Sequence, residues 1–152
     1  MPPRQPMARH QARAPHYDPL TPEQRSERMS RVRRADTKPE MIVRRLVHGM
    51  GFRYRLHDGK LPGQPDLAFK SRRKVIFVHG CFWHLHRCKR YRMPKTRLDF
   101  WEPKLTGNVE RDRRARTLLK KAGWNILVLW ECELGKTDAL RTKIRTFLED
   151  PK

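Results

Sequence analysis

Two cysteines and two histidines stand within eight residues of one another, in the segment CFWHLHRC over residues 81–88. Zn²⁺ favours thiolate and imidazole ligands, and four of them make a closed tetrahedral site. One histidine and the chain's three cysteines could form such a set: Cys81, His86, Cys88 and Cys132. The spacing therefore predicts a structural zinc site that leaves His84 free. Three buried, reduced cysteines are the alternative, although they would not explain the neighbouring histidines.

Five further side chains could carry acid–base or metal chemistry. Asp66 begins an expected strand, where a carboxylate can hold a divalent metal against a phosphate, but an aspartate after Pro-Gly is also typical of a turn. His79 and His84 could move a proton to or from water, or else be zinc ligands or exposed polar groups. Asp112 lies on the inner face of an expected helix and needs a partner there, either an imidazole or an arginine. Glu40 stands three residues after a threonine, the spacing of a capping box.

Three aromatic residues, Phe82, Trp83 and Trp101, are expected in polar loops among lysines and arginines. Aromatic side chains usually become part of the core. In a basic protein they can also act as wedges that unstack base pairs. The sequence leaves both interpretations open.

The charge of the chain indicates its partner. Its 152 residues include 36 Lys and Arg against 16 acidic residues, a formal charge of +20. Neutralising phosphates releases counterions, so nucleic acid is the expected partner. An anionic membrane is the alternative, but no basic amphipathic helix stands out and no apolar run approaches the roughly 18 residues of a membrane span. The N-terminus lacks the apolar segment of a secretory signal, and an odd number of cysteines argues against a disulfide framework.

The pattern of apolar residues predicts the elements that must position these groups. Residues 1 to about 20 are rich in proline and are expected to form a disordered basic arm. Helical spacing and caps predict helices over 22–34, 38–50, 109–122 and 138–148. Alternating or continuous apolar runs predict strands over 52–56, 66–69, 75–78 and 126–130. This order predicts one α/β domain over residues 21–152, with three layers and a mixed central sheet.

The predicted strands and helices bring the candidate residues together. Cys81 and Cys132 each follow one of the two most apolar strands. As neighbours, these strands would place both cysteines at one end of the sheet, as the zinc site requires. Asn108 is the expected N-cap of the helix that carries Asp112.

The chain resembles the very short patch repair (Vsr) endonuclease family at several motifs. They are VIFVHGCFWH at residues 75–84, NVERDRR at 108–114, LPGQPD at 61–66, GW at 123–124 and WEC at 130–132. The resemblance covers about Met29 to Leu134. It implies a restriction-endonuclease-like core and a Mg²⁺-dependent DNA endonuclease. Such an enzyme recognises the T:G mismatch left when 5-methylcytosine deaminates, and nicks one strand 5′ of the thymine.

The resemblance also assigns roles to the candidate residues. Asp66 and the backbone carbonyl of Val78 would hold the Mg²⁺, and a valine in place of the family's common threonine keeps that carbonyl. His84 would be the general base, supported by Asp112. The remaining assignments form three sets: His79 and Glu40 beside the metal; Cys81, His86, Cys88 and Cys132 around structural Zn²⁺; and Phe82, Trp83, Trp101 and Met29 as groups inserted into DNA.

The expected partner is double-stranded DNA with a T:G mismatch, bound by a monomer, with mismatch-repair proteins as further candidate partners. The resemblance implies a bacterial cytoplasmic protein associated with the nucleoid. Two alternatives remain. One is a zinc-stapled module that binds nucleic acid without cleaving it, and the other is a related nuclease that acts on another DNA structure. The arm before Pro22 lies outside the part of the chain that the resemblance covers.

Overall fold

The computed structural model describes residues 20–32 and 34–151. The chain divides into two compact units, Met1–Val32 and Arg33–Lys152. The basic arm expected over residues 1 to about 20 lies outside the described residues, apart from Leu20.

The first unit contributes one short helix, α1 (Pro22–Ser30). Thr21 caps it, because its hydroxyl accepts from the N–H of Gln24 at 3.2 Å while Gln24 Oε1 accepts from the N–H of Thr21 at 3.0 Å. This is the predicted capping box. No residue of α1 is buried, and the helix ends at Ser30, so the end predicted at residue 34 is wrong.

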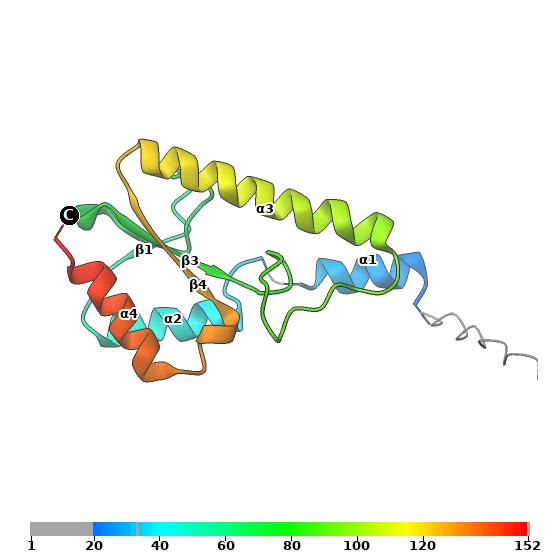
Figure 1. Cartoon of the computed structure of the whole chain (residues 1–152), viewed down its shortest axis with the longest axis horizontal. Helices are drawn as coiled ribbons and strands as arrows, with labels where there is room; N and C mark the ends of the chain where they lie inside the picture. The colour runs from blue at the N-terminus through cyan, green and yellow to red at the C-terminus, as the bar shows by residue number, and fades with distance from the viewer. Residues whose placement is uncertain (1–19, 33, 152) are drawn as a thin grey trace, which may run out of the picture. The chain divides into compact units, whose positions relative to one another are not determined.

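The second unit contains a four-stranded sheet in the order β1-β2-β3-β4. The strands span Arg55–Leu56, Leu67–Phe69, Lys74–His79 and Asn125–Trp130. β1, β2 and β3 are antiparallel neighbours, whereas β3 and β4 run parallel along their whole length (Figure 1). The predicted mixed sheet is confirmed. β1 is shorter than the strand expected over 52–56, because only two of its residues pair with β2.

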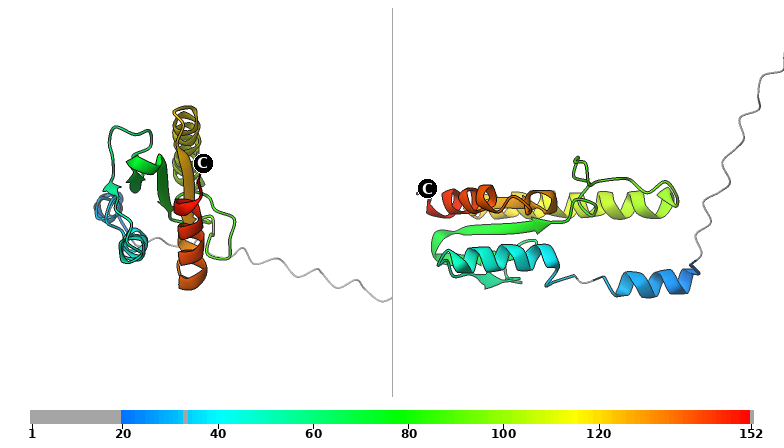
Figure 2. Two further views of the ribbon diagram at one scale, coloured as in Figure 1. Left: turned by 90° about the vertical axis from the view of Figure 1, so that its left-hand side faces the viewer. Right: turned by 90° about the horizontal axis from the view of Figure 1, so that it is seen from below.

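Helices cover both faces of the sheet, as Figure 2 shows. α2 (Lys38–Gly49) and α4 (Thr137–Glu149) pack on one face, and α3 (Leu98–Lys121) packs on the other. Successive strand residues face opposite layers. On the side of α2 and α4 these are Leu67, Phe69, Ile76 and Leu129, and on the side of α3 they are Ala68, Val75, Phe77 and Val128. The three-layer α/β architecture predicted from the sequence is confirmed.

Helix α3 begins at Leu98, so the start predicted at residue 109 is wrong. Pro103 and Gly107, two residue types that usually disfavour helix, both lie inside it. Pro103 is in the second turn, where its missing N–H removes a single helical hydrogen bond. Within residues 20–32 and 34–151, none of the helices combines the length and apolar character needed to cross a membrane.

The early start of α3 changes two expectations. Asn108 is not an N-cap; its side-chain amide lies within the helix and donates to the carbonyl of Trp83 at 3.0 Å. Trp101 is a helical residue rather than a loop residue, and its ring contacts that of Phe82. These tertiary contacts explain why the helix forms across residues that sequence patterns assign to a loop.

Two basic residues at the start of β3, Arg73 just before it and Lys74 as its first residue, donate to the C-terminal ends of two helices. Arg73 donates to the carbonyl of Ala122 at the end of α3. The buried Lys74 donates through Nζ to the carbonyls of Leu148 at 3.3 Å and Asp150 at 2.5 Å, at the end of α4. Cations favour this negative end of a helix dipole. Both helices are thereby fixed to the sheet at the end of β3 opposite the candidate site.

Candidate active site and metal centre

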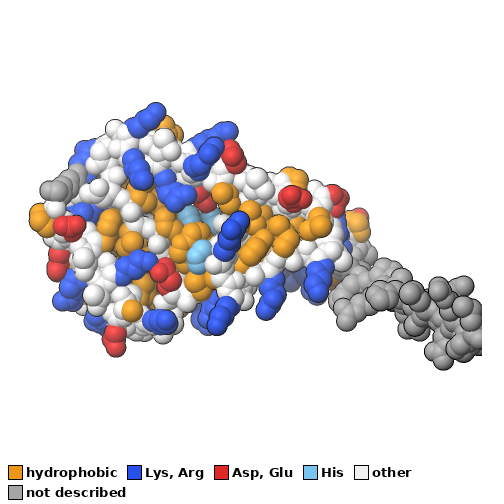
Figure 3. All heavy atoms as spheres, viewed as in Figure 1, with side chains coloured by type: hydrophobic (Ala, Val, Ile, Leu, Met, Phe, Trp, Pro, Cys, Tyr) orange, Lys and Arg blue, Asp and Glu red, His pale blue; other side chains and the backbone are white. Residues whose placement is uncertain are grey.

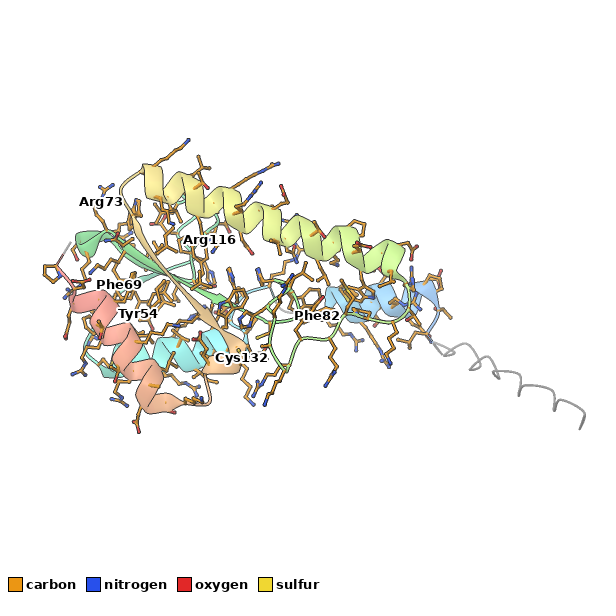
Figure 4. The ribbon with its side chains drawn as sticks, viewed as in Figure 1. Tyr54, Phe69, Arg73, Phe82, Arg116 and Cys132 are labelled. Atoms are coloured by element: carbon orange, nitrogen blue, oxygen red, sulfur yellow. The ribbon has the colours of Figure 1, made fainter. Side chains whose placement is uncertain are left out.

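The candidate residues gather where β3 and β4 end. The two parallel strands finish side by side at His79 and Trp130, so the residues that follow them share one end of the sheet. Figure 4 shows Phe82 and Cys132 at this end. On the face drawn in Figure 3, histidine side chains reach the surface among hydrophobic and basic side chains. The predicted convergence of the two strands is therefore observed.

His79, His84 and Asp112 form one cluster. The imidazole rings of His79 and His84 stack in parallel with centroids 3.9 Å apart. Nδ1 of His84 is hydrogen-bonded to Oδ2 of Asp112, and Nε2 of His79 lies 4.0 Å from Oδ1. An ionised carboxylate only accepts, so Nδ1 of His84 carries a proton, and in the neutral imidazole the lone pair is then on Nε2. Burial, and then the neighbouring His84, lower the pKa of His79 to about 4, which keeps His79 neutral near pH 7.

Asp66 lies at the start of β2 with its carboxylate turned toward β3. Its Oδ2 accepts from the N–H of Val78 at 2.6 Å, and the side chain is 15% exposed. Burial raises the pKa of Asp66 to about 6, although the hydrogen bond from Val78 opposes the rise. Gly63, in the preceding loop, has a φ of +75°, and a Cβ there would lie 2.6 Å from Cβ of Ala115. This close approach to α3 fixes the segment that delivers Asp66.

Glu40 is buried near the start of α2, 5% exposed. The N–H of Glu40 approaches the hydroxyl of its N-cap Thr37 at 3.5 Å, and Oε1 accepts from that hydroxyl at 3.1 Å. Oε2 accepts from the N–H of Asp36 at 2.9 Å rather than from that of Thr37, so the capping box expected here is incomplete. Glu40 therefore contributes to the helix cap, and its carboxylate also accepts a hydrogen bond from Arg44.

Arg44 and His57 extend the site beyond the residues expected from sequence. The Arg44 guanidinium donates to Glu40 Oε2 at 3.1 Å and to Nε2 of His57 at 2.8 Å. Nδ1 of His57 lies 3.9 Å from Oδ1 of Asp66. Arg44 follows Glu40 at the helical spacing of four residues, a signal that could have indicated the pair. Nothing in the sequence marks His57, which has a φ of +43° in the loop after β1.

The three cysteines and one histidine form a second cluster. The ligand atoms of Cys81, His86, Cys88 and Cys132 all lie within 4.8 Å of one another. None of the cysteines is in a disulfide. Sγ of Cys132 lies 3.6 Å from Nδ1 of His86, which is the edge of about 3.6 Å expected between sulfur and nitrogen ligands around tetrahedral zinc. The donor set and its spacing fit Zn²⁺.

Trp130 connects the two clusters, although in the sequence it stands within a family motif without an assigned role. Its ring stacks on His86 with centroids 4.0 Å apart and meets the ring of His79 edge-on at 5.3 Å. The segment between Cys81 and His86 also contains His84, so the fold of the cysteine cluster and the place of His84 are set together. The N–H of His86 donates to the carbonyl of Cys81 at 3.0 Å and closes this turn.

The structure brings together three of the four residues expected to enter DNA. Phe82 lies 5.1 Å from Trp83 and 5.3 Å from Trp101 between ring centroids. All three are partly exposed, and neither core cluster of the described residues includes them. Phe100, which the sequence did not single out, adds a further ring 5.1 Å from Trp101. Met29 lies on α1 in the other unit and is partly exposed.

Comparisons with known proteins define the class. The family model described as "DNA mismatch endonuclease Vsr" matches residues 17–90. The chain is 48% identical over 132 residues to "Type II nicking enzyme V.XorIIP" of Xanthomonas oryzae, covering 87% of this chain and 97% of that protein. It is 42% identical over 122 residues to "DNA mismatch endonuclease Vsr" of Escherichia coli, covering 80% and 78%. A chain with this fold and these relatives is a DNA endonuclease. It belongs to the Vsr family.

Proposed function

We propose that this protein nicks one strand of double-stranded DNA on the 5′ side of the thymine in a T:G mismatch, with Mg²⁺ as cofactor. The names of the relatives support both parts of the activity, since one is a mismatch endonuclease and the other a nicking enzyme. One observation carries the proposal. His84 is held by Asp112, and its ring stacks on His79, the residue next to Val78.

The oxygen atoms of Asp66 and Val78 fit Mg²⁺. A carboxylate and a backbone carbonyl are hard ligands of the kind that Mg²⁺ prefers. Burial raises the pKa of Asp66 because it destabilises the charged carboxylate, and a bound cation would offset that destabilisation. Mg²⁺ bound there would stabilise the charge that develops on the scissile phosphate. Valine at position 78 does not weaken this assignment, because a carbonyl ligand needs no side-chain hydroxyl.

His84 is the proposed general base. Its Nδ1 proton is engaged by Asp112, so Nε2 has the lone pair that can take a proton from the attacking water. The Asp112 carboxylate then stabilises the imidazolium that results. His79 stays neutral and its ring packs against one face of the His84 ring. Glu40, paired with Arg44, is the further carboxylate beside the proposed metal.

The cluster of Cys81, His86, Cys88 and Cys132 is the proposed structural zinc site. All four positions are protein ligands, which is typical of a structural site rather than a catalytic one. Zinc here would hold the turn that presents His84 and the aromatic residues next to it.

Mismatch recognition is assigned to the aromatic cluster of Phe82, Trp83 and Trp101, with Met29 on α1 as a further inserted group. Partly exposed rings beside a basic surface can replace base stacking when a duplex is opened. The charge of +20 supplies attraction to any DNA backbone and so cannot select the mismatch. We propose that the protein acts as a monomer in the bacterial cytoplasm, on nucleoid DNA and alongside mismatch-repair proteins.

The decisive experiment compares nicking of a T:G duplex with nicking of the matched T:A duplex, each with and without Mg²⁺. One cut strand 5′ of the thymine, only in the T:G duplex and only with Mg²⁺, is the expected result. Binding without cleavage under all conditions would identify a non-cleaving module instead. Equal cleavage of both duplexes would move the activity to another DNA structure.

A further inference from the structure

A guanidinium group occupies the centre of a set of side chains that could otherwise hold a metal ion. The ligand atoms of Asp36, Glu40 and His57 lie within 4.8 Å of one another. Arg44 contacts one atom of each: Oδ1 of Asp36 at 2.5 Å, Oε2 of Glu40 at 3.1 Å and Nε2 of His57 at 2.8 Å. The Arg44 side chain is 8% exposed and that of Glu40 is 6% exposed.

The imidazole of His57 lies between this guanidinium and the carboxylate of Asp66. Oδ1 of Asp66 is 3.9 Å from His57 Nδ1, while the other oxygen of the same carboxylate accepts from Val78. Only the imidazole of His57 therefore separates the positive charge of Arg44 from the carboxylate that is proposed to hold Mg²⁺. We propose that Arg44 is a built-in cation, which takes the place of a second divalent metal ion and positions Asp66 through His57. This inference rests on the proposed Mg²⁺ site at Asp66.

The hydrogen bond between Arg44 and His57 also determines which nitrogen of His57 carries the proton. A guanidinium only donates, so Nε2 of His57 must accept and the proton must lie on Nδ1. Nδ1 is the atom that faces Asp66. The imidazole N–H thus faces one oxygen of Asp66 from 3.9 Å, an electrostatic contact longer than a hydrogen bond, while the N–H of Val78 donates to the other oxygen at 2.6 Å. Together the two contacts favour one orientation of the carboxylate.

A second role follows from the burial of Glu40. A buried carboxylate without a cation is costly, and two acidic groups with an imidazole at this spacing attract divalent ions. Arg44 satisfies the carboxylates of Glu40 and Asp36 and fills the space between them. Removing the guanidinium without removing the acids should therefore open a cation site beside Asp66.

The first test counts Mn²⁺ ions bound to the zinc-loaded, full-length protein without DNA, by titration followed with electron paramagnetic resonance. The variants are Arg44→Met, which has a similar length but no charge, and Arg44→Lys, which keeps the charge. Arg45→Met is the matched control, because it removes a neighbouring exposed arginine from the same helix. We expect Arg44→Met to bind one more Mn²⁺ than the wild type, and the two other variants to bind the same number as the wild type. Equal counts for Arg44→Met and the wild type overturn the inference.

The wild-type count tests the proposed function separately. A wild type that binds one Mn²⁺ supports the site at Asp66, and one that binds none removes that site. If the wild type binds none, a gain of one ion in Arg44→Met still supports Arg44 as the occupant of a cation site, but it overturns the role of Arg44 as a second cation beside Mg²⁺. A wild type that already binds two ions overturns the inference, since the second position would then be open with Arg44 present.

A second measurement needs no folded Arg44 variant. Long-range ¹H–¹⁵N correlation spectra of the wild type at pH 8 report which imidazole nitrogen of His57 is protonated, with His57→Gln assigning the signal. We expect the proton on Nδ1, whereas a solvent-exposed neutral histidine favours Nε2. A protonated Nε2 in the wild type would show that Arg44 does not donate to His57, and would overturn the positioning role.

Discussion

Nδ1 of His84 donates its proton to Oδ2 of Asp112, and this bond joins the turn after β3 to the middle of helix α3. The two residues are 28 positions apart in the chain, so the pair depends on tertiary structure. His84 lies inside the cysteine and histidine segment, while Asp112 is held by a helix that packs on the sheet. The orientation of the proposed base is therefore linked both to the metal cluster and to the packing of α3.

Asp112→Asn should lower the rate of nicking by about 10²- to 10⁴-fold. An asparagine amide can donate to Nδ1 of His84, which would move the imidazole proton to Nε2 and remove the lone pair that receives the proton of water. Zinc content and affinity for T:G DNA should stay at wild-type values, because neither depends on this bond. The measurement is single-turnover nicking with protein in excess. Glu110→Gln, an exposed change two residues earlier on α3, is the control, and a wild-type rate in Asp112→Asn would remove Asp112 from the mechanism.

Much of the fold could be predicted because the central strands are continuous apolar runs. β3 and β4 are recognisable in the sequence for this reason, and their parallel pairing explains how Cys81 and Cys132 meet. The start of α3 could not be predicted in the same way. Local patterns assign Pro103 to a loop, while contacts of the helix with the aromatic segment after β3 decide its conformation.

The Arg44–His57 contact shows a second limit of sequence reasoning. The two residues are 13 positions apart, and their meeting depends on the loop that follows β1. His57 has a left-handed backbone conformation there, which no residue pattern indicates. Asp66 and Glu40 could be proposed from local spacing and family resemblance, but the side chains between them could be found only from the three-dimensional structure.

Cys132→Ser should lose the bound zinc and much of its thermal stability. A closed structural site contributes its binding free energy to folding, so losing one of four ligands weakens both together. His84→Gln should keep its zinc, because His86 supplies Nδ1 to the cluster. Metal analysis and thermal melting of both variants provide the test. Zinc loss in His84→Gln with retention in a His86→Gln variant would mean that the two histidines have exchanged roles.

Asp66→Asn should stabilise the Mg²⁺-free protein at neutral pH. Burial raises the pKa of Asp66 from 3.8 to about 6, so the folded state binds its proton more tightly than the unfolded state does. The wild type therefore loses stability as the pH rises from about 4 to about 6, by an amount on the order of 3 kcal/mol for a shift of about two units. Asparagine cannot ionise and avoids this loss. Denaturant unfolding at pH 4 and pH 7.5 should show equal stabilities at the lower pH and a more stable variant at the higher pH.

Asp58→Asn is the matched control for this pH dependence. The hydrogen bond from Lys70 lowers the pKa of Asp58, so its ionised form stabilises the fold at neutral pH and that contribution is lost as the pH falls. Asp58→Asn should therefore be less stable than the wild type at neutral pH and approach it in acid. Mg²⁺ should stabilise the wild type and Asp58→Asn but not Asp66→Asn. An Asp66→Asn variant that is less stable than the wild type at pH 7.5 would contradict the assignment of Asp66 as a metal-binding carboxylate whose charge is destabilised by burial.

Trp83→Ala should lose most of the preference for T:G over T:A duplexes while it keeps normal zinc content. A T:G pair stacks less well than a matched pair, so opening it costs less, and insertion of an aromatic ring beside it offsets an unstacking cost of roughly a few kcal/mol per step. The lower free-energy cost of opening the mismatch makes binding selective for it. Phosphate contacts cannot supply this selectivity, because phosphates are alike at both sites. Trp83 is partly exposed and contacts Phe82 and Trp101 rather than the core, so its removal leaves the fold in place. Leu118→Ala, an exposed apolar residue near the other end of α3, should leave the preference unchanged. Nicking rates on both duplexes decide the matter, since an unchanged T:G preference in Trp83→Ala would leave the aromatic cluster with a packing role alone.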